Sequence, residues 1–408
     1  MGKFLIFSLM LALLELPLVA SAAEHIVNPG DLTVAIANAK AGDLIRLLPG
    51  VYRGPVTIDK PLKLTGEKSS IVQGSGEGMV LTLLADNISI SGITVRESGS
   101  DLSQDDAVIL LREAKSITVK NCRIEARAFG IYLRGGGGHH IIHNEINGDA
   151  SLPSARRGNG IHLWHSKKNE IRDNSLTDVR DGVYLSFAHE NLIAENRAEH
   201  VRYGIHYMYS ERNTLRANRF ADCTGGIALM FSMGNHIEGN RLINNRDFGI
   251  LCLQLEHSVV AKNIIQSNGR GLFLEHSADN RFVQNQLVLN GVGVFVTAGS
   301  EQNIFSKNSF ENNLVQAFQG HSNANIWFEK GRGNEWSDYA GFDWNHDGIG
   351  ETPYKLQTAA SALMARRPLT RWFWKSPMFA FLDWWDGLLL SPKDSSFDPA
   401  PLMKGVAR

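Results

Sequence analysis

Imidazole and thioether side chains gather in the middle of the chain, at His206, Met208 and Met230. These are the ligand types that suit Cu(I), a soft metal ion. His162 and Met233 are looser candidates for the same copper site. Exposed methionine and aromatic side chains also form protein-docking faces, and single outward histidines are usually just solvated, so these alternatives stay open.

A second set of candidate ligands consists of oxygen atoms. Asp343, Asn345 and Asp347 stand at positions 1, 3 and 5 of a segment with Gly348 at position 6, which matches the first half of a calcium loop. The bidentate glutamate expected at position 12 is absent, because Tyr354 stands there. A bound hard cation such as calcium and a turn held by Asx side chains both fit this segment.

The composition excludes two classes of partner. The 408 residues include 41 Lys and Arg against 42 Asp and Glu, so the formal charge is -1 and does not favour nucleic acid or an anionic membrane surface. The hydrophobic share of 43% is that of a folded protein, and the length alone suggests two or three domains. Three cysteines cannot build a disulfide framework.

The N-terminus has the pattern of a cleaved secretory signal over residues 1–22. Lys3 precedes an apolar run, and Ala20 and Ala22 supply an A-x-A cleavage pattern. The alternative is an uncleaved anchor, but Glu15 and Pro17 interrupt a run shorter than the ~20 residues that a spanning helix needs. A mature protein in the periplasm is therefore expected.

One six-residue unit that begins and ends with asparagine recurs through the chain, followed by a glycine and a short apolar strand. The second asparagines of the units are Asn174, Asn196, Asn218, Asn240, Asn263, Asn285 and Asn308, with steps of 22 or 23 residues. Cys122 and Asn144 extend the frame upstream, with an eight-residue insertion within residues 148–157. A unit this short must stack on its neighbours to bury its apolar face.

Stacked parallel strands at ~4.8 Å spacing predict a β-helix, in which equivalent residues of successive coils lie above one another. A leucine-rich horseshoe is the main rival fold, but its helical half-repeat is missing. The aliphatic residue after each glycine belongs to the core, and the asparagines are interpreted as structural, with left-handed backbone geometry and amide bonds along the stack. Cys122, Cys223 and Cys252 are interpreted as buried free thiols, with metal ligation as the alternative.

The repeat frame predicts where the candidate copper ligands lie. His206 and Met208 occupy outward positions on one strand, with roughly 6.5 Å between their α-carbons, and Met230 lies one coil along at ~4.8 Å. These three side chains can converge on one ion. His162 lies two coils from His206, so it lines the same face without sharing the ion comfortably.

Both ends of the repeat differ from its middle. Residues 31–39 predict a short helix with Asp31 as N-cap, and together with residues 41–52 they resemble the start of pectate-lyase-like, right-handed parallel β-helices. The period is lost after about residue 320, and seven of the eight tryptophans lie between Trp327 and Trp385. The predicted organisation is a signal peptide over 1–22, an all-β solenoid over 23–320 and a tryptophan-rich extension over 321–408.

Within the extension, residues 376–392 predict a helix between two prolines that is too short to span a membrane. It either packs back on the solenoid as a cap or docks a membrane-embedded partner. The candidate docking residues are Met378, Phe379, Phe381, Leu382, Trp384, Trp385, Leu388 and Leu389.

Several features together resemble the NosD family: the signal peptide, the 22-residue repeats, the segment that starts at Asn334 and the segment that starts at Ser376. The resemblance covers essentially the whole chain, and the C-terminal segment discriminates best. It implies a periplasmic accessory protein for maturation of nitrous oxide reductase, a copper enzyme. The implied partners are that reductase, an ABC permease and ATPase of the NosY and NosF type, and a copper chaperone of the NosL type.

Two other functions fit the same fold. A polysaccharide-modifying enzyme of the lyase or epimerase type, or a carbohydrate-binding β-helix, would require carboxylates stacked on one outward column. Asp181 is the clearest acidic residue beside a repeat strand, but neighbouring coils carry Asn159, Tyr203 and Gly225 there. A scaffold that binds other proteins differs from copper delivery only in whether the metal touches it. The sequence favours a protein without catalytic activity.

Overall fold

We describe the protein from a computed structural model covering residues 22–297, 299–320, 324–374, 376–388 and 397–406. The predicted signal peptide, apart from Ala22, lies outside the described residues. No helix in the described ranges is long and apolar enough to cross a membrane.

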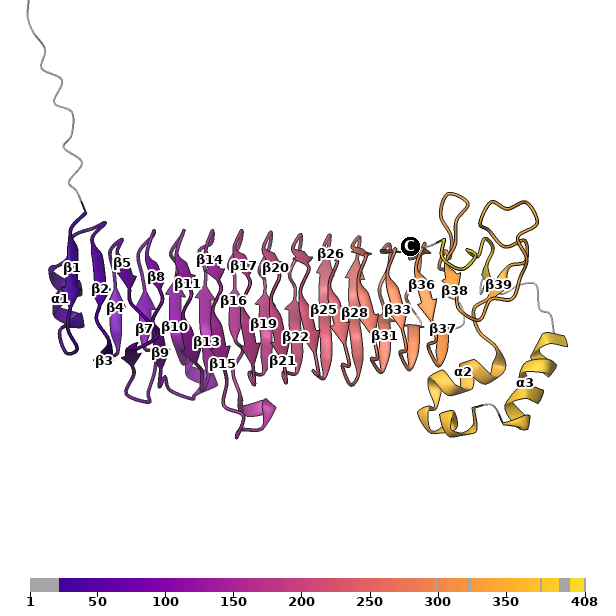
Figure 1. Ribbon diagram of the computed structural model, residues 1–408, viewed down its shortest axis with the longest axis horizontal. Helices are drawn as coiled ribbons and strands as arrows, with labels where there is room; N and C mark the ends of the chain where they lie inside the picture. The colour runs from indigo at the N-terminus through magenta and orange to yellow at the C-terminus, as the bar shows by residue number, and fades with distance from the viewer. Residues whose placement is uncertain (1–21, 298, 321–323, 375, 389–396, 407–408) are drawn as a thin grey trace, which may run out of the picture.

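Three parallel sheets run along one elongated solenoid (Figure 1). Sheet A contains β1 (Glu24–Val27), β2 (Leu44–Leu47), β5 (Lys63–Thr65), β8 (Ser89–Ser91), β11 (Thr118–Lys120), β14 (His140–Ile142), β17 (Glu170–Arg172), β20 (Leu192–Ala194), β23 (Thr214–Arg216), β26 (His236–Glu238), β29 (Val259–Ala261), β32 (Arg281–Val283) and β35 (Ile304–Ser306). Sheet B contains β3 (Gly50–Arg53), β6 (Ser70–Gln73), β9 (Thr94–Arg96), β12 (Arg123–Glu125), β15 (Glu145–Asn147), β18 (Ser175–Thr177), β21 (Arg197–Glu199), β24 (Arg219–Ala221), β27 (Arg241–Ile243), β30 (Ile264–Gln266), β33 (Gln286–Val288), β36 (Ser309–Glu311) and β38 (Glu335–Trp336).

Sheet C has its strands at the repeated glycine segments. It contains β4 (Val56–Ile58), β7 (Leu81–Leu83), β10 (Ala107–Arg112), β13 (Phe129–Arg134), β16 (Ile161–Trp164), β19 (Asp181–Ser186), β22 (Tyr203–Met208), β25 (Gly225–Met233), β28 (Phe248–Glu256), β31 (Arg270–Glu275), β34 (Val292–Val296) and β37 (Val315–Gln319). The predicted right-handed parallel β-helix is confirmed. The strand-only coils exclude the leucine-rich horseshoe.

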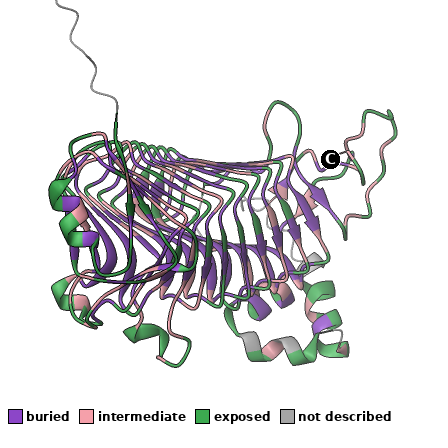
Figure 2. Cartoon of the chain, turned by 60° about the vertical axis from the view of Figure 1, so that its left-hand side comes forward, coloured by how far each residue is buried: buried purple, intermediate pink, exposed green. Residues whose placement is uncertain are grey.

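The core is one continuous column of inward side chains between the three sheets. The residues predicted to be core, such as Ile131, Val183 and Leu272, are fully buried. Figure 2 shows buried residues along the inside of every coil. Burial of about 1.5 to 3 kcal/mol per large aliphatic side chain, repeated in each coil, is the main source of stability for such a stack.

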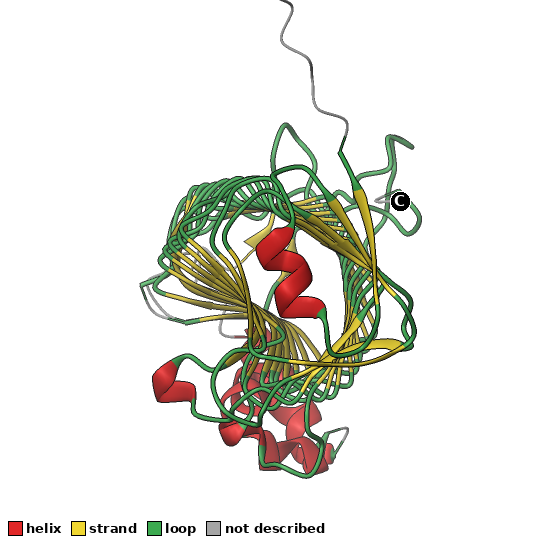
Figure 3. Ribbon diagram, turned by 90° about the vertical axis from the view of Figure 1, so that its left-hand side faces the viewer, coloured by secondary structure: helices red, strands yellow, loops and turns green. Residues whose placement is uncertain are grey.

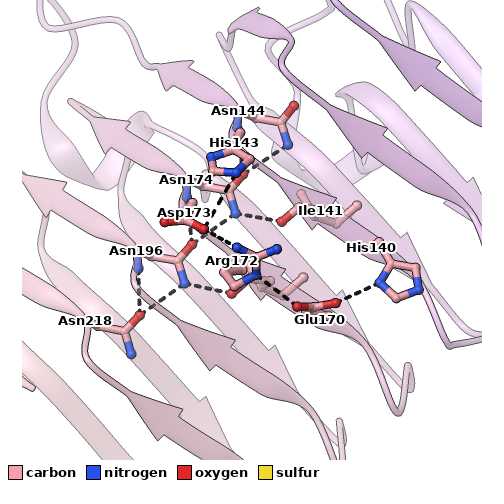
Figure 4. A network of polar contacts seen from close by, with 11 residues as sticks. His140, Ile141, His143, Asn144, Glu170, Arg172, Asp173, Asn174, Asn196 and Asn218 are labelled. Carbon is pink, nitrogen blue, oxygen red and sulfur yellow. Dashed lines mark hydrogen bonds and ion pairs between the residues drawn. The ribbon is translucent and has the colours of Figure 1, made fainter. Parts of the chain in front are cut away.

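Asparagine side chains link the coils at their corners (Figure 4). Asn196 donates from its backbone N–H and its side-chain amide to Oδ1 of Asn218, and Asn218 repeats this pattern to Asn240. The predicted amide bonds along the stack are confirmed. They satisfy backbone groups that would otherwise be buried without partners at each turn.

The left-handed backbone conformation lies one residue before each asparagine, not at the asparagine as expected. Glu195, Ala217 and Lys262 have φ near +55° and precede Asn196, Asn218 and Asn263. The asparagine itself must point inward to reach the next coil, so the outward residue before it makes the turn. Many residue types occupy these outward positions because their side chains are solvated.

A short helix closes the first coil. Helix α1 (Leu32–Asn38) lies across the N-terminal end of the solenoid (Figure 3), and its Leu32 and Ile36 are buried in the core cluster. Asp31 stands at the N-cap as predicted, but its side chain makes no capping hydrogen bond. Two 3-10 turns, η1 (Leu102–Gln104) and η2 (Ser154–Arg156), lie in loops, the second within the predicted insertion.

The solenoid continues beyond residue 320, where the sequence analysis placed its end. Strand β38 extends sheet B, and Asn334 accepts the last asparagine bond from Asn308. The tail returns as β40 (Phe397–Asp398), which pairs with β39 (Tyr354–Lys355). Asp398 is fully buried and accepts hydrogen bonds from Asn334 and from the Trp336 indole.

The rest of the extension is helical and packs beside the last coils. It comprises α2 (Ala359–Arg366), η3 (Pro368–Phe373) and α3 (Pro377–Leu388). One buried cluster joins it to the outer face of sheet C. The cluster contains Val292, Phe295, Val315, Phe318, Ala360, Met364, Ala365 and Phe379. The extension therefore covers the C-terminal end of sheet C and does not cover the middle of that sheet.

Candidate metal-binding site

The three main predicted copper ligands lie on two neighbouring strands of sheet C. His206 and Met208 are two residues apart on β22, and Met208 pairs directly with Met230 of β25. Side chains two apart on a strand share a face, and paired residues of neighbouring strands are about 4.8 Å apart. The strand register thus places these three residues at adjacent positions of the sheet, and their joint binding of copper stays a prediction. We call His206, Met208 and Met230 the soft-ligand face.

His206 is far less exposed than an outward position suggests. Only 8% of its surface is accessible. The rings of Tyr184 and Tyr203 contact it edge-to-face, with centroids 5.0 and 5.2 Å away. Aromatic residues stack along the outer column, and each ring covers the next. The histidine is therefore a fixed group in a packed surface layer, and the simple solvated interpretation is wrong for it.

A buried ion pair orients the imidazole. Asp181 Oδ2 lies 3.0 Å from Nδ1 of His206, and Arg202 donates two hydrogen bonds to the same carboxylate. Burial on its own would raise the pKa of Asp181, but the bonds from Arg202 and His206 hold it below its ordinary value. Nδ1 also lies 3.2 Å from a guanidinium nitrogen of Arg202, which can only donate. The ionised carboxylate is the nearer partner and can only accept, so we assign the hydrogen to Nδ1, which donates it to Asp181.

The other imidazole nitrogen is left with a free lone pair. Nε2 of His206 is buried and has no hydrogen-bond partner. Buried polar atoms in proteins are nearly always paired, so an orphaned one requires an explanation. A histidine that donates one N–H to a carboxylate and keeps the other nitrogen free has the arrangement typical of metal-ligating histidines.

The two thioethers lie beside this histidine. Met208 and Met230 are both half-buried, and Met230 packs against a small cluster formed by Ala228, Phe248 and Leu251. Such packing restricts the side chains without removing the sulfur atoms from reach. Imidazole and thioether donors on one rigid sheet suit Cu(I), whereas carboxylate-preferring ions find only Asp181, whose oxygens are already engaged.

The two looser candidates do not join the soft-ligand face. His162 is two coils away from His206, with Tyr184 between them in the same column. Its ring stacks on Tyr132 at 4.6 Å, and burial lowers its pKa to about 3. Met233 is exposed at the end of β25, beyond a left-handed turn at Phe231.

The cysteines are buried free thiols, as interpreted from the repeat frame. Burial raises the pKa of Cys122 to about 11 and that of Cys223 to about 12, and it also raises the pKa of Cys252. A metal ligand must be the thiolate, which these sites disfavour. In the described ranges no three His, Cys, Asp or Glu side chains are grouped to hold a metal ion.

The oxygen-rich loop holds itself together through backbone contacts. Asp343 accepts hydrogen bonds from the backbone N–H groups of Asp347 and Gly348, and Asn345 accepts a further one from Asp347. This is the geometry of a turn held by Asx side chains. Calcium at this loop stays a prediction.

All the candidate docking residues but Leu389 lie on α3, and four of them are exposed. Met378, Phe381, Trp384 and Trp385 are exposed, while Phe379 is buried in the cluster against sheet C. Leu382 is half-buried. Leu388 ends α3, and Leu389 lies outside the described residues. The helix therefore packs against the solenoid through Phe379 and also offers an apolar surface, and docking of a partner on that surface stays a prediction.

Sequence reasoning missed two features of this region. Arg202 binds Asp181 from the next coil, although only the frame position of Asp181 was considered. A row of stacked rings also follows the turn after sheet C, at His165, Phe187, Tyr209 and Phe231. Their spacing of 22 residues is visible in the sequence and could have revealed the row.

Asp181, the acidic residue considered for a lyase or epimerase, is not placed as a free acid or base. A lyase or epimerase needs an acid or base that reaches its substrate. Asp181 is fully buried and paired with Arg202, and the free nitrogen of His206 is covered. The acidic column required for calcium or catalysis is missing among the outward residues of sheet C in the part of the chain that the structure describes.

The fold and the soft-ligand face define a parallel β-helix protein with a candidate copper-binding surface on one sheet. A family model described as periplasmic copper-binding protein (NosD) matches residues 142–341, and one described as right handed beta helix region matches residues 57–176. Over residues 142–341 the chain is thus similar to the NosD family.

Two curated relatives carry the same family name. Both are called probable ABC transporter binding protein NosD. The protein from Stutzerimonas stutzeri is 33% identical over 152 residues, which is 37% of this chain and 35% of that protein. The protein from Pseudomonas aeruginosa is 33% identical over 112 residues, 27% of this chain and 26% of its own length. The aligned segments thus span about a third of the Stutzerimonas stutzeri protein and about a quarter of the Pseudomonas aeruginosa protein.

Solved structures support the fold alone. A family 28 exopolygalacturonase from Yersinia enterocolitica has a TM-score of 0.54 at 11% identity, covering 75% of this chain and 78% of its own. The A-module of the mannuronan C-5 epimerase AlgE6 from Azotobacter vinelandii has a TM-score of 0.50 at 13% identity, covering 76% and 94%.

Proposed function

We propose that this protein is a non-catalytic accessory protein of the periplasm that contacts copper during maturation of nitrous oxide reductase. It works with an ABC permease and ATPase of the NosY and NosF type and with a copper chaperone of the NosL type. Support comes from the description of the family as copper-binding and from the transporter-binding name of the relatives. Copper is the cargo and not a permanent cofactor in this proposal.

The observation that carries the proposal is the orphaned Nε2 of His206 beside two methionines. Asp181 fixes the tautomer that leaves Nε2 as an acceptor, and Met208 and Met230 supply two thioethers on the same face. Because the Tyr184 and Tyr203 rings pack on His206, copper can reach Nε2 only when these rings shift. A covered, preoriented ligand set suits transient contact better than permanent binding.

Anaerobic Cu(I) titration against a chromogenic chelator tests the copper contact directly. The wild-type protein should compete for one Cu(I), and His206→Ala combined with Met208→Ala should weaken binding by at least tenfold, because two of three donors are lost. Met403→Leu, a half-buried methionine near the C-terminus, is the matched control and should change nothing.

Copper loading of the reductase tests the role in maturation. Cells that carry the His206→Ala, Met208→Ala double variant should accumulate the accessory protein at normal levels but contain copper-deficient reductase. Circular dichroism and thermal unfolding of the variant establish that its fold is intact. Full copper loading with a folded variant would contradict the proposal.

The exposed residues of α3 are the proposed contact with the membrane-embedded permease. Trp384 and Trp385 are 59% and 51% exposed, and nearby Trp372 of η3 is 86% exposed. Large exposed apolar patches mark interaction sites, and aromatic side chains dominate the energetics of interfaces. The patch lies at the C-terminal end of the solenoid, several coils from the soft-ligand face (Figure 1).

Co-purification with the permease tests this contact. Trp384→Ser with Trp385→Ser should abolish recovery of the permease in mild detergent, while Cu(I) binding by the isolated protein stays unchanged. Trp344→Ser, also an exposed tryptophan but in the oxygen-rich loop, is the control. Undiminished recovery with the double variant would show that α3 is not the docking element.

A further inference from the structure

The segment that joins α2 to α3 combines positive charge with large exposed rings. Residues 366–375, which include η3, carry four cationic side chains and no acidic one. The cations are Arg366, Arg367, Arg371 and Lys375. We call residues 366–375 the basic aromatic segment. The formal charge of the whole chain is only -1, so the overall composition hides this local concentration of charge.

The apolar side chains of the basic aromatic segment are largely exposed. Trp372 is 86% exposed, Leu369 79% and Phe373 60%. Trp372 is the most exposed large apolar side chain in the described ranges. Single exposed apolar residues are common on protein surfaces and need no explanation, but several on one six-residue element mark an interaction site.

The rest of the extension holds this segment in place. The Arg366 guanidinium lies over the Phe318 ring of sheet C, 5.1 Å from the ring centroid. Thr370 donates hydrogen bonds from its backbone N–H and its hydroxyl to the carbonyl of Arg367. The helices α2 and α3 project to one side of the solenoid at its C-terminal end (Figures 1 and 3). The exposed rings are thus carried by a protruding element that is anchored to the last coils.

The combination of cations and rings fits a lipid surface. Tryptophan is enriched at the level of the membrane headgroups, where its ring meets hydrocarbon and its N–H meets water. Arginine and lysine beside such rings are attracted by anionic headgroups. A protein partner would need a groove that matches the protruding side chains, whereas a bilayer takes up side chains of any outline.

The charges around the segment agree with this choice. The nearest acidic residues in the sequence, Asp383 and Asp386, lie on α3 and outside the segment. Oδ1 of Asp383 accepts the backbone N–H of Ala360, so this carboxylate is engaged by α2. The segment therefore presents positive charge without an acidic residue of its own to neutralise it.

We propose that the basic aromatic segment binds an anionic lipid surface, with Trp372 and Phe373 in the headgroup region and the flanking cations on lipid phosphates. The segment lies on the membrane and does not cross it. It is next to the α3 residues proposed to contact the permease, but it requires neither the permease nor copper. The lipid contact holds the protein at the membrane surface whether or not a permease is bound.

Sedimentation with lipid vesicles tests this contact in the absence of any permease, with protein purified from the periplasm. The protein should bind vesicles of phosphatidylcholine mixed with phosphatidylglycerol about tenfold more tightly than vesicles of phosphatidylcholine alone. Raising the salt from about 50 mM to about 200 mM should weaken binding to the anionic vesicles. Tryptophan fluorescence should shift to shorter wavelength on binding, because Trp372 leaves water.

Two double variants separate the contribution of the rings from that of the charge. Trp372→Ser with Phe373→Ser should weaken binding to the anionic vesicles about tenfold or more, because two rings no longer leave water. Arg367→Gln with Arg371→Gln should weaken binding to the anionic vesicles about thirtyfold and should not change binding to phosphatidylcholine alone.

Matched variants elsewhere in the chain show whether these losses are specific. Phe342→Ser with Trp344→Ser removes two exposed rings of the oxygen-rich loop. Arg53→Gln with Arg112→Gln removes two exposed arginines of the solenoid. Vesicle binding by both control variants should equal that of the wild type, and the thermal unfolding of all four variants should be normal.

Absence of binding to anionic vesicles, or binding that survives both changes in the segment, would overturn the proposal. If Trp372→Ser with Phe373→Ser then prevents recovery of the permease in detergent, the segment is a contact with protein and not with lipid. Because the vesicles contain no permease, failure of the lipid contact and failure of the permease contact give different results.

Discussion

At the scale of single residues, buried histidines of this protein serve different purposes according to what each nitrogen meets. Both His206 and His139 have a buried Nε2 without a hydrogen-bond partner, and they differ in what surrounds them: two methionines follow His206 on sheet C. His139 occupies an asparagine position of the stack, where its Nδ1 accepts the backbone N–H of Ile117 and its backbone N–H donates to Asn169. The first histidine is positioned for a ligand, whereas the second replaces a structural amide.

The substitution of His139 for an asparagine predicts an acid-sensitive point in the fold. Burial lowers the pKa of His139 to about 4, from about 6.5 in an unfolded chain. A group whose pKa is depressed by folding gives its full stabilisation above pH 6.5 and loses it as the pH falls toward 4. Between pH 7.5 and pH 4.5 the free energy of unfolding should therefore fall in both proteins, but by about 2 to 3 kcal/mol less in His139→Asn than in the wild type.

Urea unfolding at the two pH values measures this difference. His140→Asn serves as the control, because His140 is exposed on the next position and pairs with Glu170. If the His139→Asn variant keeps the wild-type pH dependence, acid sensitivity arises elsewhere in the protein.

At the scale of the elements, the asparagine stacks determine how firmly one coil holds the next. A separate stack runs from Cys223 through Asn245, Asn268 and Asn290, and in it Asn245 accepts the backbone N–H of Cys223 and donates to Asn268. Each such residue closes bonds to two neighbouring coils. Its loss leaves buried backbone groups without partners, which cost about 1 to 3 kcal/mol each.

Adjacent asparagines allow a sharp test of the stack. Asn245→Ala should destabilise the protein by about 3 kcal/mol, because a buried donor and acceptor lose their partner. Asn244→Gly, one residue earlier, should have little effect, because Asn244 is exposed with φ of 56°, which glycine adopts easily. Chemical denaturation curves of both variants give the two free energies. Similar losses in both would mean that burial of the amide is not what stabilises the corner.

The repeat is also the reason why most of the fold was predictable. Because the period is 22 residues, the strand positions in one coil give the strand positions in every other coil. The alternation of aliphatic residues then separates core positions from surface positions. The pairing of Met208 with Met230 was predicted correctly, because the two residues are 22 positions apart and so occupy equivalent positions in neighbouring coils. The contact between Asp181 and His206 was not predicted, because it joins different columns of two coils.

The extension was predictable only in outline, because it has no period. The two prolines predicted the bounds of α3 to within a few residues. The pairing of β40 with β39, which brings the tail back to the last coil, is not indicated by any pattern in the local sequence. Asp398 lies 64 residues from Asn334, its main partner. A contact of that separation depends on the folded solenoid and not on neighbouring residues.

At the scale of the whole molecule, the solenoid acts as a rigid spacer between the soft-ligand face and α3. Each coil contacts mainly its neighbours, so coils can be added without disturbing distant ones. Duplication of residues 264–285 should leave the protein folded and its Cu(I) affinity unchanged, but should lengthen the spacer by about 4.8 Å.

Copper loading of the reductase distinguishes a spacer from a passive support. The lengthened protein should load less copper, because the soft-ligand face no longer meets its partner while α3 is docked. Loading at the wild-type level, with normal Cu(I) affinity and permease recovery, would show that this distance does not matter.

The buried carboxylate of Asp398 also explains why the stack ends. In the stack that leads to Asn334, each asparagine accepts from the previous coil and donates to the next, so an unclosed stack is a template for further growth, including growth from a second molecule. A carboxylate accepts from Asn334 but has no hydrogen to pass on. Asp398 thus ends the stack in the way that a chain terminator ends a growing polymer. By closing this edge, the returning tail keeps the β-helix from polymerising end to end into fibres.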